Sequence, residues 1–236
     1  MTVIGALLYG LGNLLHPRML WLMIWPMLVS IALWGAVALA FWPRLAAALA
    51  GLFERWLGFL RMDLGDATLI AAYVVLVLLI VPLVYITALF ILGVFGMQKM
   101  VDHVAERSFP TLERRRGGGV GGSVANGLGA LGGMALAFVI SAPLWLLPPL
   151  WPLIPLAIFA WVNQKLLRYD ALGEHADRDE MARIFRERRG ALLALGVLLA
   201  LLAYIPFVGF IGPVVFGLAF IRYLLGALQE LRTRRH

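Results

Sequence analysis

The chain has 236 residues, of which 62% are hydrophobic and only 14% charged, and its mean hydropathy is +0.91. No soluble domain of this size could hide that much apolar surface in one core, so the composition excludes a soluble protein and indicates an all-α integral membrane protein. The lack of cysteine excludes disulfides, thiolate nucleophiles and cysteine-based metal centres. The four histidines are widely spaced, so neither a metal site nor a cofactor is expected.

The first two apolar runs are each long enough to cross a bilayer as a helix. They cover residues 19–42 and 67–97, and a span needs about 20 apolar residues. Between them, leucines and aromatic residues recur at helical spacing over residues 45–60, with the charged side chains elsewhere on the wheel. This pattern predicts an amphipathic helix that lies on the membrane surface or packs against a neighbouring protomer.

The third and fourth apolar runs are each interrupted by a cluster of helix-breaking residues. They predict helical hairpins over residues 124–167 and 191–229. The expected turn residues are Pro143, Pro148, Pro149, Pro152 and Pro155 in the first hairpin, and Pro206, Gly209, Gly212 and Pro213 in the second.

Arm length favours hairpins that enter the membrane only in part. Counted between the breakers, each arm of the fourth run reaches about 23 Å, short of the roughly 30 Å hydrocarbon core, and the second arm of the third run, Leu156–Leu167, is also short. Two full spans plus two partly inserted hairpins are therefore favoured, with a six-span protein as the alternative. Broken backbone at membrane depth needs protein or water around it, which favours a homo-oligomer or mutual packing of the hairpins.

Basic residues indicate the orientation of the chain in the membrane. Lys and Arg number five in residues 98–116 and seven in residues 165–189, against three in residues 43–66. The positive-inside rule therefore places both termini and both basic segments in the cytoplasm. The net charge of +7 follows these boundaries and forms no separate basic face, so the expected partner is the lipid bilayer and not nucleic acid.

Two glycine-rich motifs resemble nucleotide-binding loops but lack the required context. Gly127, Gly129 and Gly132 match G-x-G-x-x-G without the acidic residue about 20 positions on. Gly129 and Gly133 instead form a small-xxx-small pair that favours close helix packing. Residues 114–116 are three arginines before a glycine run, which favours a flexible basic linker over an anion cradle.

Residues 177–190 predict a cytoplasmic amphipathic helix, with Asp177 as its cap and Glu180 in the capping-box position. Either it is a solvated helix, or Arg186, Arg188 and Arg189 form a vestibule that attracts an anion.

Two arginines lie at the edges of apolar runs. Arg222 is the only charge between Arg189 and Glu230, and Arg18 begins the first span. Charges at membrane depth are functional candidates, although both side chains could also snorkel to the headgroups.

Several sequence stretches resemble one membrane-protein family. In the last third these are Tyr169-Asp170, Glu187-Arg188-Arg189-Gly190, Tyr204-Ile205-Pro206-Phe207 and Gly212-Pro213. Residues 10–25, centred on Leu15-His16-Pro17-Arg18-Met19-Leu20, add an N-terminal match. Together they resemble the CysZ-type sulfate permeases, which are grouped with the etoposide-induced membrane proteins.

The resemblance implies two long spans with two partly inserted hairpins, cytoplasmic termini, a bacterial inner-membrane location, oligomers and, for the CysZ members, sulfate uptake. That family opens its first span with a Pro-Gly-Leu-Arg-type anion motif. This chain has Pro17-Arg18-Met19-Leu20, in which the arginine is displaced and the glycine is missing.

The leading functional hypothesis is an inner-membrane permease or channel for a sulfate-like inorganic anion, with Arg18 and Arg222 attracting the anion and Arg186, Arg188 and Arg189 forming the inner mouth. The alternative is a non-transporting scaffold or biogenesis protein that binds a partner through residues 165–190. No acid–base pair or nucleophile lies at membrane depth, so an enzyme is not expected.

Overall fold

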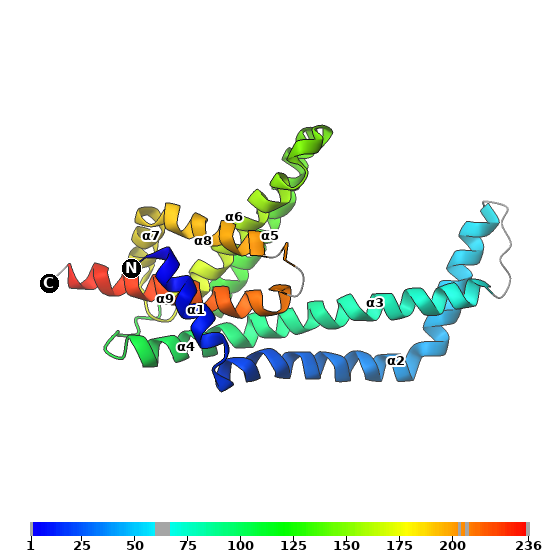
Figure 1. Ribbon diagram of the computed structural model, residues 1–236, viewed down its shortest axis with the longest axis horizontal. Helices are drawn as coiled ribbons and strands as arrows, with labels where there is room; N and C mark the ends of the chain where they lie inside the picture. The colour runs from blue at the N-terminus through cyan, green and yellow to red at the C-terminus, as the bar shows by residue number, and fades with distance from the viewer. Residues whose placement is uncertain (1, 60–66, 203, 206–207, 235–236) are drawn as a thin grey trace. The chain divides into compact units, whose positions relative to one another are not determined.

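The computed structural model describes residues 2–59, 67–202, 204–205 and 208–234. Over these residues the chain forms nine α-helices and no strand, as the composition predicts. The α-helices are α1 (Val3–Leu14), α2 (Pro17–Phe59), α3 (Ala67–Ile91), α4 (Met97–Ser108), α5 (Val120–Ile140), α6 (Leu153–Leu172), α7 (Arg178–Glu187), α8 (Arg189–Leu202) and α9 (Val208–Thr233), as Figure 1 shows. A π-helical turn (Leu92–Gly96) and two 3₁₀ turns, η2 (Ala142–Leu146) and η3 (Pro148–Leu150), complete the described elements.

Five of the described helices are long and apolar enough to cross a membrane. These segments are Pro17–Trp56, Ala67–Ile91, Gly121–Ile140, Pro148–Leu172 and Ile211–Thr233. The chain is therefore a multi-pass membrane protein. It divides into two compact units, one built from residues 21–94 and the other from residues 1–20 together with 95–236.

The unit of residues 21–94 contains most of α2 and all of α3. Residues 45–59 of the predicted amphipathic helix are helical and form the end of α2, which continues to Phe59 with Pro26 and Pro43 inside it, and their place on the membrane surface stays a prediction. Figure 1 shows that α2 bends in its C-terminal part. Proline inside a long helix kinks it without ending it where the remaining backbone bonds persist. The indole of Trp34 donates a hydrogen bond of 2.9 Å to the Thr87 hydroxyl of α3.

The other unit is built around α9. In the most apolar 18-residue stretch of α9, 83% of the residues are buried, against 6% in that of α3. The core side chains of α9 include Phe216, Phe220 and Leu224. Helices α1, α4, α6, α7 and α8 pack against it. Gly10 of α1 allows the closest approach, because a Cβ atom there would lie 2.4 Å from the Val215 carbonyl oxygen. The helix richest in buried residues is therefore enclosed by protein.

Helices α5 and α6 lie side by side, and Figure 1 shows their far ends projecting from the other helices of this unit. A Cβ atom on Gly133 would lie 2.5 Å from the Trp161 ring, and the Gly129 carbonyl accepts a 3.3 Å hydrogen bond from Lys165. Gly133 thus faces α6, which confirms the predicted packing role at this position, whereas Gly129 is exposed. Near the other end, the Ser123 hydroxyl donates 2.7 Å to Asp170.

The turn residues of the first predicted hairpin fall in and beside the connection between α5 and α6. Pro143 lies in η2, Pro148 and Pro149 lie in η3, and Pro152 lies just before α6. Pro155 lies inside α6, where it occupies the first helical turn. A proline is tolerated there because backbone N–H groups in the first turn of a helix have no intrahelical acceptor. The N–H that proline lacks therefore costs the helix no hydrogen bond.

The second predicted turn is shorter than expected. Gly209, Gly212 and Pro213 belong to α9, which begins at Val208, and Pro206 lies outside the described residues. The argument from short arms is therefore wrong for two helices. With 20 and 26 residues, α6 and α9 reach about 30 and 39 Å, whereas α8 has only 14 residues and reaches about 21 Å. Partial insertion of the hairpins stays a prediction.

Candidate anion-binding site

Arg222 lies in α9 and is covered by two aromatic rings. Its guanidinium carbon lies 4.6 Å from the centroid of the Phe109 ring and 5.0 Å from that of the Tyr9 ring. Its Nη1 atom is buried and has no hydrogen-bond partner among the described residues. A buried donor without an acceptor is costly, so this atom is a natural place for an anion to bind.

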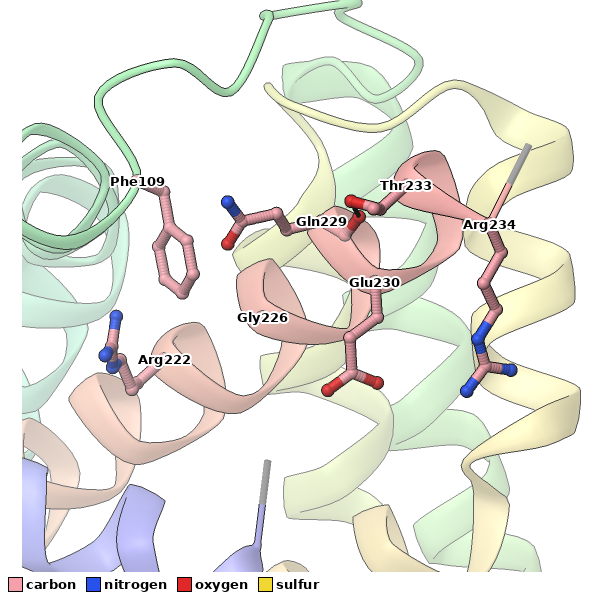
Figure 2. A pocket seen from close by; sticks show the side chains of 7 residues that line it. All are labelled: Phe109, Arg222, Gly226, Gln229, Glu230, Thr233 and Arg234. Carbon is pink, nitrogen blue, oxygen red and sulfur yellow. Dashed lines mark hydrogen bonds between the residues drawn. The ribbon is translucent and has the colours of Figure 1, made fainter. Parts of the chain in front are cut away.

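An open cavity of about 500 Å³ lies beside this arginine. Figure 2 shows the Arg222 guanidinium next to the Phe109 ring, with Glu230 farther along α9 and Arg234 just after its end. The remaining lining residues are Gly226, Gln229 and Thr233. The lining residues that belong to α9, at positions 222, 226, 229, 230 and 233, fall on one face of the helix, where neighbours lie three or four residues apart.

Local structure fixes both rings. Phe109 is the residue after α4, its N–H donates to the Ala105 carbonyl at 2.8 Å, and its side chain is buried. Tyr9 belongs to α1 and its hydroxyl accepts a 3.3 Å hydrogen bond from Ser108. The end of α4 therefore holds both rings that cover the arginine.

A second predicted arginine reaches the same stretch of α9 but is neutralised there. Arg188 donates a 2.5 Å hydrogen bond from Nη2 to Glu230, one of the residues that line the cavity. Arg186 and Arg189 flank Arg188 in the sequence and are exposed. The structure thus brings Arg188 and Arg222 to one face of α9 and leaves Arg186 and Arg189 in solvent.

A charge cluster around Glu180 was not anticipated from the sequence beyond its capping role. Glu180 is fully buried and accepts two bonds of 2.9 Å from Arg232 and one of 3.0 Å from Arg115. Burial alone would raise the pKa of Glu180, but the hydrogen bonds from Arg232 and the Asp177 backbone, with the charges of Arg232 and Arg115, outweigh it and lower the pKa. These residues line a second cavity of about 630 Å³, which shares Gln229 and Thr233 with the first.

The capping box that the sequence predicts is confirmed. Asp177 accepts from the Glu180 backbone at 2.7 Å, and the Glu180 carboxylate accepts from the Asp177 N–H at 3.0 Å. The predicted helix ends earlier than expected, because α7 stops at Glu187 and α8 starts at Arg189. Nothing in the local sequence signals the bond to Arg232, which lies 52 residues away.

The glycine run after the three arginines forms a fixed contact, and the prediction of a flexible linker is wrong for this part. The N–H groups of Arg116, Gly117 and Gly118 donate to the carbonyls of residues 173–176 over 2.8–3.0 Å. A Cβ atom on Gly117 would lie 2.5 Å from the Ala176 carbonyl oxygen. These glycines therefore serve close backbone packing instead of flexibility.

Residues 6–213 match the family model described as Sulfate transporter CysZ/Etoposide-induced protein 2.4. The chain belongs to this family. Its CysZ members are sulfate transporters. No match was found among the curated proteins or the solved structures with which the chain was compared.

Arg18, at the start of α2, lies among other basic side chains. Arg18 is exposed, and its backbone N–H donates 3.3 Å to His16 Nδ1. The His16 ring lies 4.8 Å from the ring of His103, whose buried Nε2 has no partner among the described residues. Burial, and then the charges of His16, Arg107 and Arg18, lower the pKa of His103. Arg18 and Arg222 thus have different surroundings, one basic and open and the other aromatic and buried.

Proposed function

We propose that this CysZ-family protein is an inner-membrane permease or channel for a sulfate-like inorganic anion, with both termini in the cytoplasm and Arg222 as a binding residue. The observation that carries the proposal is the buried Nη1 atom of Arg222, which has no acceptor among the described residues and belongs to a side chain that lines an open cavity. Family membership supports an anion as the ligand.

The environment of Arg222 supports binding of an anion from outside the chain. Among the described residues, no carboxylate forms an ion pair with it, and the faces of the two rings supply no conventional acceptor. A charge-assisted hydrogen bond contributes about 1.5–3 kcal/mol, so an oxyanion that reaches Nη1 gains a bond that the protein leaves unmade.

The exposed arginines have a different role in this proposal. Arg186 and Arg189 are exposed positive charges that flank Arg188 in the sequence. Arg188 itself is bonded to Glu230. Exposed charges raise the local concentration of anions and act over about a Debye length, so they form the inner mouth. Arg18, with its basic neighbours, provides a second attractive point.

The test is sulfate uptake into liposomes that contain the purified protein. Replacing Arg222 by Gln removes the charge and keeps a polar side chain, and we expect sulfate uptake to fall about 10- to 100-fold. Arg183→Gln is the matched control, because Arg183 is exposed and pairs with Glu187 at 2.7 Å. Arg18→Ala tests the second point separately.

Two results would overturn the proposal. One is sulfate uptake no faster than in empty vesicles by protein that remains folded. The other is uptake that Arg222→Gln leaves unchanged. The first result would leave the scaffold hypothesis, in which a partner binds residues 165–190. That hypothesis is then tested by asking whether a partner co-purifies with the unmodified protein and is lost when this segment is altered.

A further inference from the structure

Resting on the proposed function, we propose that Tyr9 and Phe109 are positioning residues of the anion site. Their ring faces take the place that a carboxylate holds at other arginines of this chain. They stabilise the Arg222 cation and leave its hydrogen-bond donors available to the transported anion.

Three arginines near the same end of α9 show the difference. Arg188 donates to Glu230 at 2.5 Å, and Arg232 donates to Glu180 through two nitrogens at 2.9 Å. Both are neutralised by a carboxylate of the chain itself. Arg222 instead has a ring centroid at 4.6 Å and another at 5.0 Å from its guanidinium carbon.

A carboxylate and an aromatic ring differ in whether they occupy the N–H donors of the guanidinium and cancel its charge. A carboxylate accepts the N–H groups of the guanidinium and cancels its charge. An aromatic face attracts the cation through its quadrupole, carries no net charge and accepts no conventional hydrogen bond from it. The two rings therefore leave the positive charge and the Nη1 donor of Arg222 unused, and no other described residue accepts from Nη1.

The rings are held by contacts that do not involve the arginine. The Ser108 hydroxyl bonds to the Tyr9 hydroxyl, and Phe109 follows Ser108 directly. Gly10, next to Tyr9, brings α1 against the backbone of α9 at Val215. Since the rings are oriented in advance, binding an anion does not have to order them, which favours affinity.

The experiment measures sulfate uptake into liposomes as a function of sulfate concentration. We expect Phe109→Leu and Tyr9→Leu each to raise the half-saturation concentration about 3- to 30-fold, since each removes one cation–π contact. The maximal rate per folded protein stays close to that of the unmodified chain. Tyr9→Phe retains the ring, and Phe109→Trp retains a stronger one, so both keep the half-saturation concentration within about twofold or lower it.

The aromatic replacements also separate positioning from packing. If the rings only fill space, Phe109→Trp will be at least as harmful as Phe109→Leu, and the loss will appear in the folded fraction or the maximal rate. That result would overturn the inference. So would an unchanged half-saturation concentration in folded Phe109→Leu protein.

A double variant distinguishes failure of this inference from failure of the proposed function. In the Arg222→Gln background, Phe109→Leu is expected to have no further effect on the half-saturation concentration, because the cation it positions is absent. If Arg222→Gln alone leaves uptake unchanged, the proposed function fails. If Arg222→Gln impairs uptake but Phe109→Leu acts equally in both backgrounds, the positioning role alone fails.

Discussion

Arg222 and Arg232 lie on the same helix, ten residues apart, and the chain treats them in opposite ways. Arg232 is bound on several sides, by the Glu180 carboxylate, by the His175 carbonyl at 2.7 Å and by the Glu113 carbonyl at 3.0 Å. Arg222 has aromatic rings in their place and a buried donor to which the described residues offer no acceptor. An arginine whose donors are filled by the chain stabilises the fold, whereas one whose donors are left open is available to a ligand.

The largest expected effect is loss of stability on removal of Glu180. Glu180→Ala leaves Arg232 and Arg115 without the buried carboxylate that both contact, and breaking a buried pair from one side costs about 3–5 kcal/mol. Thermal unfolding of the detergent-solubilised protein measures it. Glu187→Ala, which breaks an exposed pair with Arg183, should leave the unfolding temperature unchanged. Equal effects of the two changes would show that the Glu180 cluster has no special structural role.

The two arginines themselves provide the direct comparison. Arg232→Met should lower the free energy of unfolding by about 1.5–3 kcal/mol, because charge-assisted bonds to Glu180 are lost. Arg222→Met should change it by less than about 1 kcal/mol, because only cation–π contacts are lost and an unsatisfied donor is removed. Denaturation curves of both variants measure this difference, and the opposite order would reverse the assignment of roles.

Gly117→Ala perturbs the Arg232 end without touching Arg222. A Cβ atom there would lie 2.5 Å from the Ala176 carbonyl oxygen and 2.6 Å from Asp177 Cα, and such overpacking costs about 1–3 kcal/mol. We expect a lower unfolding temperature with sulfate uptake per folded molecule unchanged. Gly119→Ala is the control, since nothing lies within 4 Å of a Cβ atom at that position. A loss of uptake with unchanged stability would contradict the separation of the two ends.

The smallest expected effect is a pH dependence of stability due to His175. Burial, followed by the charge of Arg114, lowers its pKa below the ordinary value of 6.5; Arg232 acts in the same direction and Asp102 opposes it. Below pH 6.5 the unfolded chain binds the proton more readily than the folded one. The free energy of unfolding therefore decreases as the pH is lowered, by at most about 1.4 kcal/mol per pH unit.

Unfolding temperatures between pH 7.5 and 5 measure this slope. His175→Phe should reduce it, while His103, which is also buried with a lowered pKa, keeps its own contribution. An identical slope in the variant would show that His175 titrates alike in both states.

Features that depend on neighbouring residues were predictable from the sequence. The helical class, the capping box of Asp177 with Glu180 and the packing of Gly133 against α6 follow from composition and short spacings, and the structure agrees. Family membership was likewise evident from short motifs and is confirmed over residues 6–213.

Features that depend on distant partners were not predictable. The bond between Glu180 and Arg232 joins residues 52 positions apart, and Arg222 meets rings from α1 and from the end of α4. Helix ends at proline were also misjudged, because a proline breaks, kinks or begins a helix according to which backbone acceptors remain nearby.

The packing of α1 against α9 has a consequence for the order of synthesis. These are the first and the last helices along the described sequence, yet Gly10 of α1 contacts the backbone of α9 at Val215. Until residues 208–233 have been synthesised, the Ala6 and Gly10 face of α1 lacks the surface that buries it. Helix α1 can therefore pack only after α9 has been synthesised, so this unit completes its folding after translation of α9.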